Sequence, residues 1–214
     1  MIDTYHQQRL NMLDGQIKPF SVINTRILNA FESVAREEYI PLERRALAYL
    51  GGDLPMGNGR FQIEPAAHAR LIQEAHIQPD AKVLDIGCMT GYSTAILSHL
   101  TSNVVGLDSV EWVAQAKNLA HQSLNFEAGD LTTGLPLSGP FDVIVINGAI
   151  QQIPEAIIGQ LEEGGIIATF WRGVRNQGHA VLYHKRNGDL HEQVLFDAFV
   201  SILPGFEKLE GFSL

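Results

Sequence analysis

The chain has 214 residues, of which 45% are hydrophobic and 18% charged, and its formal net charge at pH 7 is −9. This composition allows the buried core of one α/β domain and excludes a largely disordered chain. The acidic balance argues against a nucleic-acid footprint, which needs a basic face, and against adsorption to an anionic membrane. A single cysteine, a polar start over residues 1–10 and no apolar run of membrane-spanning length together predict a cytoplasmic protein without disulfides.

The first 50 residues predict helices, because apolar side chains recur there at spacings of three or four. Residues 51–60 form a glycine- and proline-rich stretch, for which a substrate loop and a plain connector are both open interpretations. A further helix is predicted from Pro65, since proline suits the first helical position. We expect one domain, with residues 1–78 as a helical extension and substrate loop and residues 79–214 as the core.

Strand and helix patterns alternate in the core. Strands are predicted at 82–86, 103–107, 125–128, 141–146 and 166–170, with helices at 93–100, 110–123 and 154–161. Two final strands flank Asn187-Gly188, a strong signal for a β-hairpin. The order predicts a Rossmann-like α/β fold, with a mostly parallel seven-stranded sheet that ends in an antiparallel hairpin.

Acidic residues follow three of the predicted strands. Asp85, Asp108 and Asp130 each stand at a strand's carboxyl end. Carboxyl ends of parallel strands meet at one edge of a sheet, so we expect these acids to line one pocket. For Asp130 taken alone, a helix N-cap is the simpler interpretation. Gly87 and Gly91 suit a turn that lets a ligand approach the backbone.

The loop after Asp85 favours S-adenosylmethionine over a dinucleotide. A dinucleotide fingerprint requires glycine where this chain has Met89, and Asp85 would repel a pyrophosphate. S-adenosylmethionine has no phosphate and carries positive charge, and its ribose suits Asp108. The predicted cofactor-binding residues are Asp85, Gly87, Cys88, Met89, Gly91, Tyr92, Asp108, Ser109, Gly129, Asp130, Leu131 and Asn147. The histidine and cysteine spacings predict no metal site.

Several stretches resemble the protein-L-isoaspartate O-methyltransferase family, from about Met12 to Gly205. They comprise residues 12–17, 34–41, 54–59, 83–87, 129–130 and 140–144. The N-terminal stretches are the specific ones, because most S-adenosylmethionine methyltransferases share the core motifs. The resemblance implies a cytoplasmic protein-repair enzyme that methylates isoaspartyl carboxylates of damaged proteins or peptides. It gives no signal for an oligomeric state.

The active-site segment departs from the family pattern. Ile63 stands where the family has its active-site serine, and Gln62 beside it is the alternative polar group. The resemblance implies a substrate loop that includes Leu54, Pro55, Met56 and Gly57, with His68 on the helix that follows. His68 is equally compatible with an ordinary helix side chain. Two hypotheses stay open: a methyltransferase of this type, or a non-catalytic or redirected relative that keeps the fold and the cofactor site.

Overall fold

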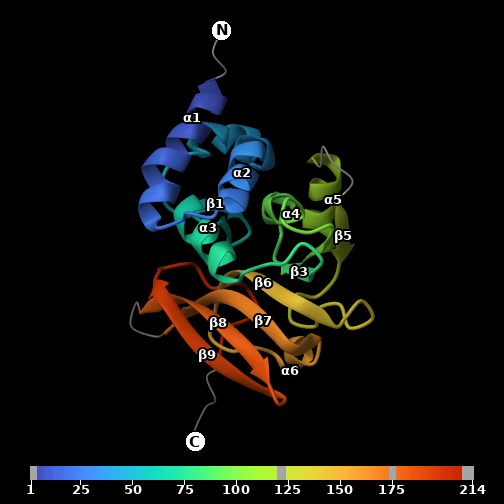
Figure 1. Ribbon diagram of the computed structural model, residues 1–214. Coiled ribbons are helices and arrows are strands. Elements are labelled where there is room, and N and C mark those ends of the chain that lie inside the picture. The colour runs from blue at the N-terminus through green and yellow to red at the C-terminus, as the bar shows by residue number, and fades with distance from the viewer. Residues whose placement is uncertain (1–3, 120–123, 174–176, 209–214) are drawn as a thin grey trace, which may run out of the picture.

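The computed structural model describes residues 4–119, 124–173 and 177–208 (Figure 1). Its main sheet has seven strands in the order β5-β4-β3-β6-β7-β8-β9. The strands are β3 (Lys82–Ile86), β4 (Asn103–Asp108), β5 (Asn125–Ala128), β6 (Phe141–Ile150), β7 (Leu161–Arg172), β8 (Gly178–Arg186) and β9 (Asp189–Asp197). Strands β3 to β7 run parallel to one another. Strand β8 pairs antiparallel with β7, and β9 pairs antiparallel with β8. The predicted Rossmann-like sheet with a terminal hairpin is confirmed.

The central strands are buried on both faces, which explains their continuous apolar sequences. Val83 and Val145 join the core cluster that includes the N-terminal helices. Leu84 and Ile144, which are register partners in β3 and β6, join the cluster on the opposite side. Successive side chains of a strand point to opposite faces, so one apolar run supplies both cores.

Several predicted elements have different bounds in the structure, including the strand predicted at 166–170, which runs from Leu161 to Arg172 as β7. The strand expected to end at residue 146 continues as β6 to Ile150, and Ala149 pairs with Phe170 of β7. The predicted helix over 154–161 shortens to α6 (Glu155–Ile158), because β7 already begins at Leu161. Asn147 therefore lies within a strand, where a post-strand loop was predicted.

The main helix contacts with the seven-stranded sheet come from residues 65–119, and the N-terminal helices pack mainly on these helices. The N-terminal part comprises α1 (Thr4–Met12), a π-helical turn (Leu13–Ile17), 3-10 turns (Lys18–Phe20, Arg36–Tyr39, Leu42–Leu47) and α2 (Thr25–Ser33). Asn24 caps α2, accepting a hydrogen bond from the Arg26 amide at 2.9 Å. The remaining helices are α3 (Pro65–Glu74), α4 (Tyr92–Ser98) and α5 (Val110–Leu119). The prediction for α5 extended over residues 120–123, which lie outside the described residues.

The stretch over residues 51–60, predicted as a loop, contains most of a small hairpin. Strands β1 (Leu54–Gly57) and β2 (Arg60–Gln62) pair antiparallel as a separate two-stranded sheet. Asn58 and Gly59 connect them with φ values of 51° and 70°. This is the left-handed backbone of a tight hairpin turn, for which Asn-Gly is the favoured sequence. The hairpin projects Arg60 toward the main sheet.

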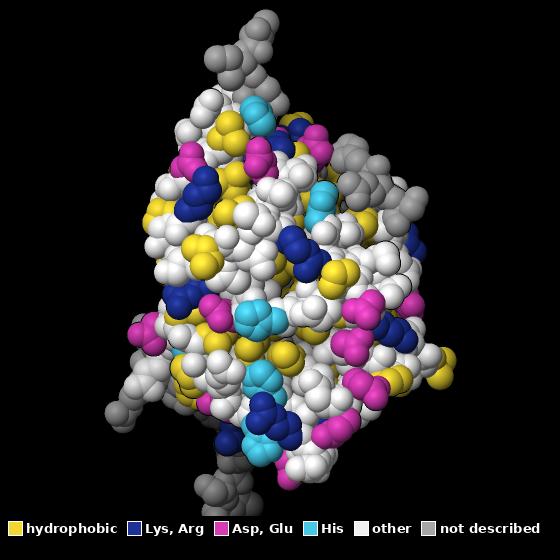
Figure 2. Space-filling model, viewed as in Figure 1, with side chains coloured by type: hydrophobic (Ala, Val, Ile, Leu, Met, Phe, Trp, Pro, Cys, Tyr) yellow, Lys and Arg dark blue, Asp and Glu magenta, His cyan; other side chains and the backbone are white. Residues whose placement is uncertain are grey.

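The surface carries charges of both signs. On the face that Figure 2 shows, basic side chains are interspersed with acidic ones and do not form one continuous area. Over residues 4–119, 124–173 and 177–208, no helix combines the length and apolar character needed to cross a membrane.

Candidate functional site

A tight loop joins β3 to α4 at the carboxyl edge of the sheet. Gly87, Met89 and Gly91 all have positive φ, at 79°, 48° and 91°. The Gly87 amide donates to the Leu107 carbonyl at 2.9 Å, which fixes the loop against β4. A side chain at Gly91 would collide with Phe126, whose ring lies 2.6 Å from the position of an added Cβ. The loop therefore needs glycine at both of its ends, as the sequence pattern predicts.

Asp85 is fully buried beneath this loop. Ser93 and Thr94 donate to its Oδ2 at 2.6 Å each, and Asn147 Nδ2 donates to its Oδ1 at 2.5 Å. Burial raises the pKa of the Asp85 carboxyl to about 6, partly offset by these hydrogen bonds, and nearby Asp108 adds to the rise. Asp85 is thus held in place by two helix side chains and one β6 side chain.

Asp108 is also fully buried, and Arg60 binds it as a two-pronged ion pair. Arg60 Nη1 lies 2.9 Å from Oδ1, and Nη2 lies 2.8 Å from Oδ2. The backbone amides of Met89 and Ser109 donate to the same carboxylate, each at 2.8 Å. Arg60 Nη2 additionally donates to the Gly87 carbonyl at 3.0 Å. The guanidinium therefore joins the hairpin, the loop and the end of β4.

Asp130 is exposed to solvent, whereas Asp85 and Asp108 are fully buried. Its Oδ1 accepts hydrogen bonds from the Thr132 and Thr133 amides at 2.8 and 3.0 Å. These bonds, with that of the Thr132 hydroxyl first, lower the pKa of the Asp130 carboxyl. Asp130 does not share the buried environment of Asp85 and Asp108, and its place in the cofactor pocket stays a prediction. Among the described residues no helix begins at Asp130, so its hydrogen bonds close a local turn and not a helix N-cap. Its neighbour Gly129 donates to the Asp108 carbonyl at 3.0 Å.

The remaining residues of the predicted cofactor set divide by exposure. Cys88, Met89 and Tyr92 are buried, and burial raises the pKa of the Cys88 thiol well above its usual range. Asn147 is buried as well, whereas Ser109 and Gly129 are exposed and Leu131 is half-buried. The Met89 side chain belongs to the hydrophobic core. It therefore points into the protein, not outward to solvent.

The opposite wall of the site comes from β2 and α3. Ile63 is buried in the core cluster, and its carbonyl accepts a hydrogen bond from Arg36 at 3.0 Å. Gln62 and His68 are also buried. Among the described residues, Gln62 Oε1 and both ring nitrogens of His68 have no hydrogen-bond partner. Burial lowers the pKa of His68 to about 3, so its ring is neutral. Unsatisfied polar atoms in a core are uncommon and call for an explanation.

The predicted substrate loop coincides with β1. Leu54 and Met56 are buried, whereas Pro55 is exposed and Gly57 is half-buried. Arg44 Nη1 donates to the Pro55 carbonyl, and the Glu64 amide donates to Asp53 Oδ1 at 3.0 Å. These contacts fix β1 to Arg44 and join the residues before β1 to those after β2.

Little space remains between the two walls. One cavity of about 10 Å³ is lined by residues that include Gln62, Ile63, His68 and Met89. A second cavity of about 10 Å³ lies beside Arg60, against residues 200–204. Each has the volume of about one water molecule, whereas small-ligand sites measure roughly 300–1,000 Å³.

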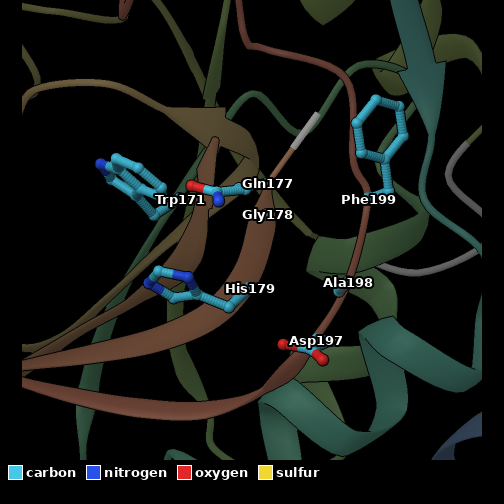
Figure 3. Close-up of a pocket in the computed structure, with 7 residues that line it drawn as sticks. All are labelled: Trp171, Gln177, Gly178, His179, Asp197, Ala198 and Phe199. Atoms are coloured by element: carbon cyan, nitrogen blue, oxygen red, sulfur yellow. The ribbon is translucent and has the colours of Figure 1, made fainter. Parts of the chain in front are cut away.

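A larger and more open hollow lies where β7 ends and β8 begins (Figure 3). It measures about 680 Å³ and is lined by Trp171, His179, Asp197 and Phe199, among others. The Trp171 and His179 rings stack with their centroids 5.1 Å apart. Figure 3 shows the two side chains on the same side of the hollow. None of the predicted cofactor residues lines it.

Among the described parts of the chain, no three His, Cys, Asp or Glu side chains lie close enough together to hold a metal ion. The predicted site residues that the structure does bring together are Asp85, the loop over residues 87–92, Asp108 and Asn147. Sequence reasoning missed Arg60 as the partner of Asp108, and Ser93 and Thr94 as partners of Asp85. No local signal links Arg60 to Asp108, because 48 residues separate them.

Comparison with solved structures defines the class first: the fold is that of the Rossmann-like methyltransferases. A protein-L-isoaspartate O-methyltransferase structure aligns with a TM-score of 0.76 and 22% identity, covering 94% of this chain and 66% of that longer one. A Plasmodium falciparum structure assigned to the same enzyme type, solved with S-adenosyl-L-homocysteine, aligns with a TM-score of 0.72 and 20% identity over 93% and 98%.

Sequence comparison identifies the family. The profile described as protein-L-isoaspartate(D-aspartate) O-methyltransferase matches residues 7–203. Protein-L-isoaspartate O-methyltransferases of Yersinia pestis (strain Pestoides F) and Yersinia pseudotuberculosis (serotype O:1b, strain IP 31758) are each 32% identical over 205 residues, covering 92% of this chain and 97% of theirs. The chain belongs to the protein-L-isoaspartate(D-aspartate) O-methyltransferase family.

Proposed function

We propose that this protein is an S-adenosylmethionine-dependent methyltransferase that esterifies the side-chain carboxylate of isoaspartyl residues in proteins or peptides. The observation that carries the proposal is the family match, which covers the N-terminal helices and the β1–β2 hairpin as well as the shared core. The repair of damaged proteins in the cytoplasm is the biological role that we infer. The single cysteine and acidic charge of the chain accord with that compartment.

The cofactor would face Asp85, the loop over residues 87–92, Asp108 and Asn147, with Ser109 and residues 129–131 at its outer edge. In the conformation described, these residues do not leave room for it. Asp108 is already bound by Arg60, and the adjoining cavities measure about 10 Å³ each. Cofactor binding therefore requires the cleft to open.

Methylation of a carboxylate requires few catalytic side chains from the protein. A carboxylate has an ordinary pKa of about 4 and is already ionised at neutral pH, so no general base is required. Alignment of the reactants and exclusion of water then supply most of the rate. Gln62, Ile63 and His68 are buried, so the wall that they form can both hold the reactants in alignment and keep water away from them.

Gln62 and His68 are the residues we assign to the acceptor side. Their side chains carry unsatisfied polar atoms and border one small cavity together with Ile63. A neutral imidazole N–H, or the Nε2 of the Gln62 amide, can donate to a carboxylate without adding a titratable charge, whereas Gln62 Oε1 can only accept. Ile63 itself offers no hydrogen bond, so these two side chains are the available substitutes for the family's serine.

A second candidate function is a relative that keeps the fold without methylating isoaspartate. Two observations favour it: the buried apolar Ile63 at the serine position, and the Arg60–Asp108 pair in the cofactor cleft. A lost hydrogen bond to a buried partner costs roughly 1–3 kcal/mol, which corresponds to about ten- to hundredfold in rate.

A methyl-transfer assay distinguishes the two functions. The wild type is given labelled S-adenosylmethionine and an isoaspartyl peptide, with the matching aspartyl peptide as control. The methyltransferase proposal predicts base-labile methyl ester on the isoaspartyl peptide alone, and a higher rate for Ile63→Ser. Absence of ester with both proteins, when binding of S-adenosylhomocysteine is measurable, would establish the non-methylating alternative.

A further inference from the structure

Arg60 occupies the position at which the cleft would receive a nucleoside. Its side chain enters from β2, is 7% exposed, and ends in the bidentate pair with Asp108. Its Nη2 also approaches the loop glycine, since a Cβ added to Gly87 would lie 3.1 Å from it. The guanidinium thus fills the space over the loop on which a cofactor would rest.

The hydrogen-bonding capacity of Asp108 is fully used. An ionised carboxylate offers about four lone-pair positions. Arg60 Nη1 and the Ser109 amide donate to Oδ1, while Arg60 Nη2 and the Met89 amide donate to Oδ2. Both amides belong to the backbone and stay in place, so only Arg60 can leave. Ribose hydroxyls and Arg60 are therefore mutually exclusive partners of Asp108.

The distribution of free space agrees with this exclusion. Phe61 and Asn147 line both of the small cavities. Phe61 follows Arg60 on β2, so both side chains move with the same strand. Withdrawal of β2 would join the two cavities into one cleft over the Gly87 loop.

The β1–β2 hairpin forms a small sheet of its own, and Leu54 and Met56 pack its inner face into the core. Within the described residues, β1 and β2 pair only with each other, and Gly52, Gly57 and Gly59 all have positive φ. An isolated two-stranded hairpin is marginally stable by itself and relies on what it contacts. Its polar link to the main sheet is Arg60, which binds Asp108 and the Gly87 carbonyl.

We propose that Arg60 is an internal competitor of the cofactor: it closes the cleft by binding Asp108, and a nucleoside enters only when the β1–β2 hairpin withdraws it. The inference rests on the proposed function, because the competing ligand is S-adenosylmethionine or its product. A guanidinium would also repel the positive charge that S-adenosylmethionine carries. Affinity is then reduced by the fraction of molecules in the open state.

Binding calorimetry with S-adenosylhomocysteine tests the competition. Arg60→Gln removes the charge and the bidentate contact with Asp108, whereas Arg60→Lys keeps the charge but cannot form both parallel hydrogen bonds. Arg186→Gln, at an exposed position on β8, is the matched control for loss of one arginine. We expect Arg60→Gln to bind at least about tenfold more tightly than wild type, with Arg60→Lys in between and Arg186→Gln unchanged.

The measured affinities test the competition by Arg60 and the binding of the cofactor separately. Equal affinities of wild type and Arg60→Gln would overturn the competition while leaving cofactor binding intact. No binding by any variant would overturn both. If Arg60→Gln does not fold, hydrogen exchange in the wild type decides. The competition predicts faster exchange of the β2 amides when S-adenosylhomocysteine binds, and unchanged exchange on binding would refute it.

Discussion

Replacing His68 by phenylalanine is expected to stabilise the protein, increasingly so in acid. The imidazole is buried between Phe31 and Tyr92, with ring centroids at 5.7 and 6.3 Å. Neither ring nitrogen has a hydrogen-bond partner in the described part of the chain. A buried unsatisfied polar atom costs roughly 1–3 kcal/mol, which a phenyl ring does not incur. A small cavity adjoins the site and can accept the slightly larger ring.

The acid dependence follows from the pKa of His68, which falls from 6.5 to about 3 on burial. Between pH 6.5 and about pH 3, His68 is protonated in the unfolded chain but stays neutral in the folded protein. The stabilising contribution of the neutral ring is therefore complete above that pH and is lost as the pH falls. Each pH unit costs about 1.4 kcal/mol, so the advantage of the variant should widen by about 3 kcal/mol between pH 7 and pH 4.

Denaturant unfolding of wild type and His68→Phe at several pH values measures this difference. His99→Phe, at an exposed position, is the control for exchanging the ring. A difference between wild type and variant that stays constant from pH 7 to pH 4 would refute a neutral buried His68. If His68 also binds the acceptor, as we propose, the stabilised variant should lose methyl transfer.

Three further changes are expected to have measurable effects. Burial raises the pKa of Asp85 from 3.8 to about 6, so its stabilising contribution is present in acid and is lost as the pH rises. In denaturant unfolding, Asp85→Asn should gain about 2 kcal/mol over wild type between pH 4 and pH 7. Gly91→Ala should lower the melting temperature more than Gly188→Ala, because both have positive φ but only Gly91 has Phe126 within contact. Cys88 should react with a thiol reagent only at the rate of unfolding, since it is buried and its pKa is raised. Equal melting temperatures, or rapid labelling of the native thiol, would contradict the packing described.

The sequence predicts the sheet and the acids of the cleft well, because both depend on local pattern. Asp85 and Asp108 stand at strand ends that the apolar runs locate. The β1–β2 hairpin was missed although Asn58-Gly59 is the same signal as Asn187-Gly188, since the surrounding glycines and proline resemble an ordinary loop. Local chemistry, correctly weighed, would have located this turn.

The partner of Asp108 could not be found in this way. Whether an arginine on one hairpin reaches a carboxylate 48 residues away depends on how the hairpin docks, which no local pattern specifies. The exposure of Asp130 has a similar origin. Its two threonines were visible in the sequence, but the geometry of their turn decides whether the carboxylate faces the cleft.

A crystal structure of the protein with S-adenosylhomocysteine would test most directly whether Asp108 serves either Arg60 or a nucleoside. We expect the ribose hydroxyls on the Asp108 carboxylate, the Arg60 guanidinium withdrawn from it, and the β1–β2 hairpin displaced from the Gly87 loop. A bound nucleoside in the cleft beside an intact Arg60–Asp108 pair would contradict this expectation.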